Sequence, residues 1–213
     1  MAAHYEDEEI TIYKVKCAPY DNNAYLLVCP KTNESIIIDT PADHCKLIRA
    51  ARDSDVKAIL ITHNHSDHIQ GLTKVTSTIP SPVGIGEADA WALPKPPDRF
   101  LKDGDIITAG TIVLKALSTP GHTPGSTCFV VGKHLFSGDT LFPGGPGRSE
   151  SSQNLAQTID SITRKLFVLG DVVVFHPGHG EDGDIKTAKE EYAVFESKDH
   201  PVDLSGDVLW LRD

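Results

Sequence analysis

The segment from His63 to His68 constrains this chain more than any other part of its sequence. It reads His-Asn-His-Ser-Asp-His, so six consecutive residues hold three imidazoles and one carboxylate. It follows an apolar run, Val56–Thr62, that predicts a buried strand, and it precedes a short helical segment. Because alternate residues of an extended chain point the same way, His63 and His65 can bind one cation together. Asp67 and His68, at the turn into the helix, can then face a second cation, and both residue types are ligands that Zn²⁺ accepts.

Three further segments repeat this order of strand, turn and candidate ligand. Each places a histidine or an aspartate just past a predicted strand with a glycine beside it, where the backbone can turn sharply. The candidates are His122 in GHTPG, Asp139 in GDT and His179 in HPGHG. Loops at one edge of a rigid sheet are where sites are usually assembled. The four segments together therefore predict one metal centre built from distant parts of the chain.

The remaining pattern predicts many short strands and a few helices, arranged as layered sheets with helices outside them. Apolar periodicity indicates strands at Ile10–Lys16, Ala24–Val28, Ser35–Asp39, Val56–Thr62, Val83–Gly86, Ile106–Ala109, Thr111–Ser118, Ser126–Val131, His134–Ser137 and Val172–Phe175. Helices are predicted from Pro41, as the first helical residue, to Arg52, over Gln153–Leu169 with Ser151 or Ser152 as its cap, and over Ile185–Ser197. The density of proline and glycine indicates loops at Leu93–Pro97 and Pro143–Gly147.

Charge and composition exclude several classes of partner. The net charge of −10 argues against nucleic acid and against an anionic membrane surface, because binding to either is driven by basic patches. No apolar run approaches the length that spans a bilayer. The first ten residues, MAAHYEDEEI, are acidic where a signal peptide would be basic and then apolar, so we expect a cytoplasmic protein.

The cysteines indicate the same compartment. Four of them in 213 residues are too sparse for a disulfide scaffold, and we expect buried or half-buried thiols at Cys17, Cys29, Cys45 and Cys128. Cys17 and Cys29 flank one predicted hairpin and could touch there.

The set THNHSDH, TPGHTPGS, FSGDTLF and PGHG resembles the metallo-β-lactamase superfamily, and most of all its glyoxalase II branch of thioester hydrolases. The hairpin start DNNAY at residues 21–25 is also similar to that of glyoxalase II. The resemblance implies an α+β fold, the four-layer αβ/βα sandwich, in a single domain over residues 1–213. It further implies two metal ions, expected to be zinc, with iron or manganese as alternatives in one or both sites. Carried over by position, the ligands of the first metal would be His63, His65 and His122, those of the second Asp67, His68 and His179, with Asp139 bridging the two.

Departures from the family patterns narrow the expected function to small-molecule hydrolysis. Metallo-β-lactamases proper lack an aspartate at the position of Asp139 and are exported, and RNA-processing relatives need a basic surface. Full-length glyoxalase II adds a C-terminal region with basic residues that hold the glutathione carboxylate, whereas residues 199–213 of this chain form a short, acidic segment. The identity of the thiol that carries the acyl group of the substrate therefore stays open. Arg148, in GPGRS, aligns with a basic residue that contacts substrate in glyoxalase II and in the related persulfide dioxygenases. We expect Arg148 to bind substrate, with a solvated surface arginine as the alternative.

The predicted activity is hydrolysis of a thioester or ester. Two Zn²⁺, the carboxylates of Asp67 and Asp139 and one hydroxide carry a total charge of about +1, which suits an anionic small-molecule substrate. The hydroxide, generated by the two metals and oriented by Asp67, would attack the carbonyl without a separate base. The alternative is a persulfide dioxygenase with one iron held by two histidines and an aspartate. A lactonase or β-lactamase-like activity ranks below both, and the oligomeric state stays open.

The other histidines carry weaker predictions. His176, three residues before His179, is a minor candidate for a residue that orients a ligand. No functional role is predicted for His4, His44, His134 and His200.

Overall fold

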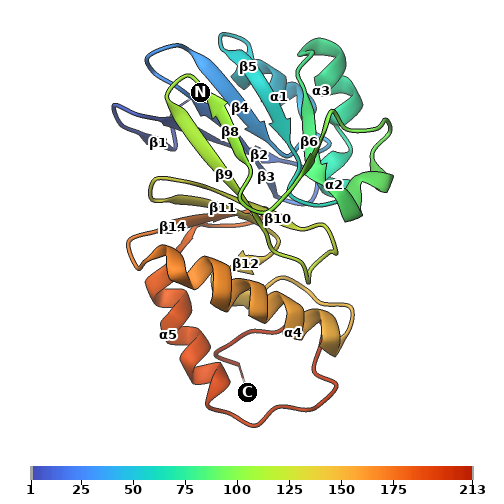
Figure 1. Cartoon of the computed structure of the whole chain (residues 1–213), viewed down its shortest axis with the longest axis vertical. Helices are drawn as coiled ribbons and strands as arrows, with labels where there is room; N and C mark the ends of the chain where they lie inside the picture. Colours follow the sequence, from blue (N-terminus) through green and yellow to red (C-terminus); the bar gives the residue numbers. More distant parts are fainter. Residues whose placement is uncertain (1, 213) are drawn as a thin grey trace.

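Two mixed β-sheets packed face to face form the centre of the protein, and helices cover their outer faces (Figure 1). The computed structural model describes residues 2–212. The first sheet has seven strands in sequence order: β1 (Tyr5–Glu6), β2 (Thr11–Cys17), β3 (Asn22–Val28), β4 (Glu34–Ile38), β5 (Asp55–Leu60), β6 (Val83–Gly86) and β7 (Arg99–Leu101). The second has six, in the order β15 (Gly183–Asp184), β14 (Val174–Pro177), β11 (His134–Gly138), β10 (Thr127–Val131), β9 (Ile112–Ser118) and β8 (Ile106–Ala109).

The helices divide between the two sheets. Apolar side chains of α1 (His44–Ala51) and α3 (Leu72–Thr78) pack on the first sheet, and those of α4 (Ser152–Ser161) and α5 (Ile185–Glu196) pack on the second. The single turn α2 (Ser66–Ile69) and the 3₁₀ segment η1 (Glu87–Ala92) connect strands of the first sheet. This order of helix, sheet, sheet and helix is the four-layer α+β sandwich that the resemblance implied (Figure 1). No helix within residues 2–212 has both the length and the apolar character needed to cross a membrane.

Three apolar clusters hold these layers together, and β4 shows how one strand contributes to two of them. Ile36 and Ile38 belong to the cluster between the sheets, while Ile37 points to the opposite face and packs with the helices. Successive side chains of a strand alternate between faces, so a strand buried on both sides needs an unbroken apolar run. The prediction of an interior strand here is confirmed.

The prediction for the first helix is wrong at its beginning. The helix begins at His44 rather than at Pro41. Asp39 has a φ of +61°, and the backbone of Thr40 bonds across to the segment that follows β5, through Thr40 N–H to His68 O (2.8 Å) and Gly71 N–H to Thr40 O (2.8 Å). These backbone groups hold two distant segments together and are not free to start a helix.

Further differences lie in the C-terminal half and at the sheet edges. The α4 helix is capped by Ser151 as predicted, but it ends at Ser161 and continues as a π-helical turn (Ile162–Leu166) and a 3₁₀ turn (Phe167–Leu169). The expected loop at Pro143–Gly147 contains part of a small hairpin, formed by β12 (Leu141–Phe142) and β13 (Gly145–Pro146). The strand expected at Val172–Phe175 is displaced by two residues, to β14. The short edge strands β1 and β7 were not predicted.

The cysteines also differ from expectation in two respects. Cys17 packs in the cluster under the helices, while Cys29 packs in the cluster between the sheets. They therefore lie on opposite faces and do not touch, and all four thiols are free. Burial of Cys17, Cys29 and Cys128 confirms the prediction for those three, whereas Cys45 is exposed.

Candidate metal centre

The seven residues predicted as ligands come from four segments and meet at one place. His63 and His65 follow β5, and Asp67 and His68 form the first turn of α2. The other three lie in loops: His122 between β9 and β10, Asp139 directly after β11, and His179 after β14. Each segment leaves a strand and turns at once, as the positions of the glycines indicated.

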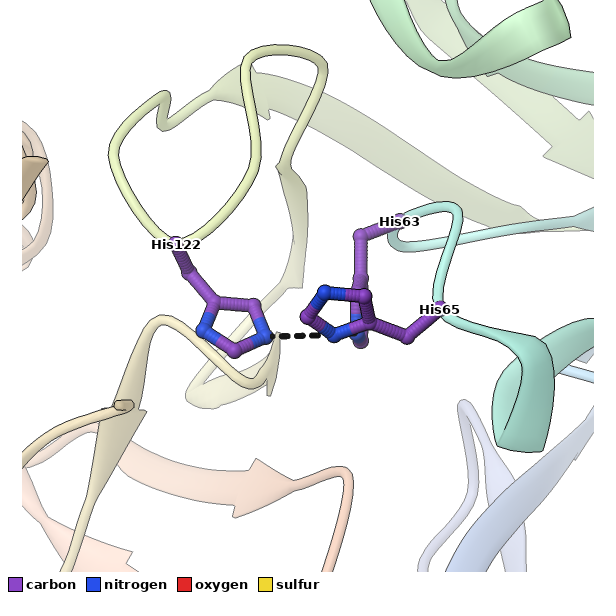
Figure 2. A group of neighbouring side chains, drawn as sticks. All are labelled: His63, His65 and His122. Carbon is purple, nitrogen blue, oxygen red and sulfur yellow. Dashed lines mark hydrogen bonds between the residues drawn. The ribbon is translucent and has the colours of Figure 1, made fainter. Parts of the chain in front are cut away.

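His63, His65 and His122 form the first group of ligand atoms (Figure 2). The Nδ1 atom of His65 lies 3.1 Å from Nε2 of His63 and 3.0 Å from Nε2 of His122. Ligand atoms about 2.0–2.1 Å from a tetrahedral zinc ion lie roughly 3.3 Å from one another. The three imidazoles therefore point toward a common centre with the spacing of a tetrahedral site.

Asp67, His68 and His179 form the second group. Nε2 of His179 lies 3.2 Å from Nε2 of His68 and 3.2 Å from Oδ2 of Asp67, and the third side of this triangle, from His68 Nε2 to Asp67 Oδ2, is 3.6 Å. Two imidazoles and a carboxylate at this spacing suit a divalent transition metal.

Asp139 lies between the two groups. Its Oδ2 is 3.7 Å from His122 Nε2 and 4.0 Å from His63 Nε2, while its Oδ1 is 3.5 Å from His68 Nε2. Oδ1 is buried and accepts no hydrogen bond from any described residue. A buried carboxylate oxygen without a donor is costly, and a cation between the groups would satisfy it. The residues present thus fit two adjacent metal ions bridged by Asp139.

The protonation states of His63 and Asp139 agree with this fit, whereas the carboxylates of Asp139 and Asp39 outweigh burial and raise the pKa of His68 well above its ordinary value, so a metal would have to displace the proton on its Nε2. Burial and the neighbouring His68 hold the pKa of His63 well below its ordinary value, so that ring stays neutral. Burial opposes ionisation of Asp139, but His68 and the other imidazoles outweigh it and hold the pKa of this carboxyl well below its usual range. Neutral imidazole and ionised carboxylate are the forms that bind metal.

Asp39 orients His68 directly and His63 through Thr62, on the side of each ring that faces away from the site. It is buried and accepts hydrogen bonds at 2.8 Å from His68 Nδ1–H and from both the N–H and the hydroxyl of Thr62. The Thr62 hydroxyl in turn accepts from His63 Nδ1–H at 2.9 Å. With the proton of each ring held at Nδ1, the lone pair of Nε2 points into the site. Sequence reasoning missed Asp39, although an aspartate that directly follows three isoleucines was an available signal.

The outer nitrogens of His122 and His179 are engaged as well. His122 Nδ1–H donates to the carbonyl of Arg148, and His179 Nδ1–H donates to the carbonyl of Tyr20, each at 2.9 Å. Asn22 donates its side-chain N–H to Oδ2 of Asp67 at 2.9 Å. Asn22 lies in the hairpin start that resembles glyoxalase II. Four ligand histidines are therefore held by partners that leave Nε2 free for metal.

Asp89, the second residue that sequence reasoning missed, ties two ligand loops together. It is fully buried and accepts from the backbone N–H of Asn64 (3.0 Å), the N–H of Gly125 (2.8 Å) and the hydroxyl of Thr123 (2.6 Å). It thereby connects the loop of His63–His68 to the loop that carries His122. Nothing in its local sequence, EADAW, signals this role.

His176 faces away from the centre. Its Nδ1 lies 2.9 Å from Asp182 Oδ2 and its Nε2 lies 3.0 Å from His134 Nδ1. Asp182 also binds Lys14 and His4. The contacts of His176 within the described residues thus connect strands and the N-terminal segment rather than orienting a metal ligand.

A cavity of about 300 Å³ opens beside the ligands. Its walls include His122, Asp139 and His179, the half-buried Phe142, and Arg148. The guanidinium of Arg148 is exposed and pairs with Asp207, with 3.1 Å between Nη1 and Oδ2. Arg148 therefore borders the cavity, and its partner there is a carboxylate of the same chain. Two larger hollows, beneath α3 and α1, contain none of the seven ligands.

The family model described as the metallo-β-lactamase superfamily matches residues 18–179, which include all seven residues predicted as ligands. This chain belongs to the metallo-β-lactamase superfamily. A hydroxyacylglutathione hydrolase of Polaromonas is 35% identical over 166 residues, which are 75% of this chain and 62% of that relative. The chain therefore spans less than two thirds of that relative's length. A human mitochondrial persulfide dioxygenase is 32% identical over 175 residues, covering 78% of this chain and 67% of that protein.

Solved structures agree with the fold. A B3 metallo-β-lactamase superposes with a TM-score of 0.77 at 28% identity, covering 84% of this chain and 96% of that one. A protein crystallised in a di-iron-bound form superposes with a TM-score of 0.70 at 29% identity, covering 83% and 96%. The resemblance inferred from the four motifs is confirmed.

Proposed function

We propose that this protein is a hydrolase that cleaves a thioester or ester at a binuclear zinc centre. The observation that carries the proposal is the buried, unpaired Oδ1 of Asp139 between two groups of three ligand atoms. The relatives add support, because a hydroxyacylglutathione hydrolase is among the proteins most similar to this chain. Zinc is expected since imidazole and carboxylate ligands at tetrahedral spacing suit it.

The proposed mechanism assigns a task to each part of the site. Two divalent cations would supply the hydrolytic chemistry, by lowering the pKa of water toward neutrality and by polarising the carbonyl. Asp67, held by Asn22 at 2.9 Å, is placed to accept a proton or hydrogen bond from the attacking water. Asp139 sets the separation of the two ligand groups. Phe142 contributes an apolar side chain to the wall of the cavity.

The substrate is proposed to be a small molecule with an anionic group. A cavity of about 300 Å³ is at the lower end of the range for small-molecule sites. Arg148 borders it with a planar guanidinium, which pairs well with a carboxylate.

The test combines metal analysis with two substrates. We expect close to two zinc ions per chain and hydrolysis of S-lactoylglutathione, measured as loss of the thioester. One equivalent of iron with little zinc, together with oxygen consumption on glutathione persulfide, would refute the proposal.

That result would favour the second candidate, a persulfide dioxygenase. Its basis is the 32% identity to the human enzyme and a subset of the same ligands. His63 and His122 with Asp139 offer two imidazoles and one carboxylate, at 4.0 and 3.7 Å from nitrogen to oxygen, as a mononuclear iron site needs. Turnover of a chromogenic cephalosporin in place of the thioester would instead favour a β-lactamase-like activity.

A further inference from the structure

A segment near the C-terminal end of the chain forms one wall of the cavity beside the metal ligands. We call residues 204–212 the C-terminal wall. Asp207, Val208 and Leu209 from this segment line the cavity together with Phe142 and Arg148. Figure 1 shows the chain after α5 as a red trace that turns back toward α4 and ends between α4 and α5. None of the four sequence motifs includes it, so only the fold brings it to the site.

The C-terminal wall is anchored at several points. Ser149 and Gly206 exchange two backbone hydrogen bonds, of 3.1 and 2.9 Å, and Trp210 N–H donates to the carbonyl of Gly144 at 2.8 Å. The Trp210 side chain is fully buried and packs edge-on against Tyr192, with 5.5 Å between ring centroids. Backbone pairing together with a buried aromatic anchor fixes the position of the segment.

The wall presents two different kinds of surface to the cavity. Val208 is buried while Leu209 stays 36% exposed, so an apolar side chain remains available for contact. Asp207 instead places its carboxylate on Arg148, and the side chains of this pair are 76% and 70% exposed. An exposed ion pair contributes little to stability, so a second anion can compete for the arginine.

We propose that the C-terminal wall determines substrate specificity, with Asp207 as an internal counter-ion that an anionic group of the substrate displaces from Arg148. Leu209 contacts the apolar part of the same substrate. This inference rests on the proposed function, because it concerns the substrate of that site. Asp207 therefore lowers the affinity of the site for anionic substrates, because they must displace it from Arg148. The affinity for neutral substrates is not affected.

The first test is Asp207→Asn, which keeps the shape of the side chain and removes its charge. The matched control is Asp203→Asn, which removes the same charge from an exposed residue outside the cavity. The probes are S-lactoylglutathione, which is anionic, and the neutral S-lactoyl-N-acetylcysteamine, which carries the same acyl group. Binding of S-methylglutathione, which contains no thioester, is measured by calorimetry on the zinc-loaded protein.

Asp207→Asn is expected to lower the KM for S-lactoylglutathione and the Kd for S-methylglutathione by about two- to fivefold, equivalent to about 0.4–1 kcal/mol. The KM for the neutral thioester should not change. Leu209→Ala should raise the KM for both thioesters by about the same factor, roughly two- to tenfold. Val202→Ala is its control, since Val202 is 98% exposed and lies outside the cavity.

Three outcomes would overturn the inference. An equal fall in KM and Kd in Asp203→Asn would mean that the net charge of the protein, rather than the contact between Asp207 and Arg148, sets the affinity. An equal change for both thioesters in Asp207→Asn would mean a structural effect. Calorimetry that shows no tighter binding of S-methylglutathione by Asp207→Asn also overturns it. If the wild type hydrolyses neither thioester, the proposed function fails, while calorimetry still decides the role of Asp207.

Discussion

Replacing Asp39 by asparagine separates the role of this buried carboxylate in metal binding from its role in folding. Asparagine keeps one carbonyl oxygen, which can still accept from the N–H of Thr62. Its amide N–H groups then face the Thr62 hydroxyl and His68 Nδ1, which both donate to Asp39 at 2.8 Å. The hydroxyl can rotate to accept. The ring of His68 can accept at Nδ1 only if its proton moves to Nε2, the nitrogen that faces the metal site.

The magnitude follows from these contacts. Loss of a partner that orients a metal ligand costs about 10- to 100-fold in metal affinity, or about 1.4–2.7 kcal/mol. A buried donor left without an acceptor costs the metal-free fold about 1–3 kcal/mol. The pKa of His68 should fall as well, because burial lowers it and the carboxylates of Asp139 and Asp39 hold it well above its ordinary value.

Zinc affinity measured by competition with a chromophoric chelator, and urea unfolding of the metal-free protein, test the two effects separately. The matched control is Asp89→Asn. Asp89 is equally buried and also accepts three hydrogen bonds, but none of them comes from a ligand side chain. We expect both variants to lose similar stability, with a smaller loss of zinc affinity in Asp89→Asn than in Asp39→Asn, because Asp89 holds the two loops without contacting a ligand side chain. If Asp39→Asn keeps wild-type zinc affinity while losing stability, its assignment as the residue that orients His68 is refuted.

Three other changes test the centre and its surroundings. Asp139→Ala should lower kcat for thioester hydrolysis by about 100-fold or more in a protein that stays folded, and activity within about threefold of wild type would contradict the bridging role. In Gly178→Ala the added Cβ would lie 2.2 Å from Asp139 Oδ1 and 2.6 Å from His68 Cε1, so elemental analysis should show fewer than two zinc ions per chain; full occupancy would count against this geometry. Burial, with His176 and Lys133, lowers the pKa of His134 to about 4, below the value near 6.5 expected in the unfolded chain. The contribution of neutral His134 to the free energy of unfolding is therefore fully present above pH 6.5. At most about 3 kcal/mol of this free energy is lost as the pH falls to 4. Urea unfolding of the metal-free His134→Gln variant should show a shallower decline over this range, and an equal decline would disprove the assignment.

The elements that could be predicted are those whose burial leaves a pattern in neighbouring residues. Residues 36–38 of β4 are apolar without interruption because both faces of the strand are covered. The strands β1, β7 and β12 are too short for any period, and β13 consists of the glycine and proline that normally indicate a loop. These strands form because tertiary contacts bring a partner beside them, and no local pattern records that.

By itself, the sequence determined which atoms are available to bind metal and how they are spaced within each segment. His63, His65 and Asp67 could be assigned because only one residue of backbone separates each from the next, and so short a segment sets their relative directions. Only the tertiary structure decided which residue hydrogen-bonds to the outer atoms of each ligand and which residues line the cavity. Asp39 reaches His68 across 29 residues, and Asp207 reaches Arg148 across 59. Distances between such remote groups depend on how the sheets, helices and C-terminal wall pack against one another, and packing is a property of the whole chain rather than of any short segment of it.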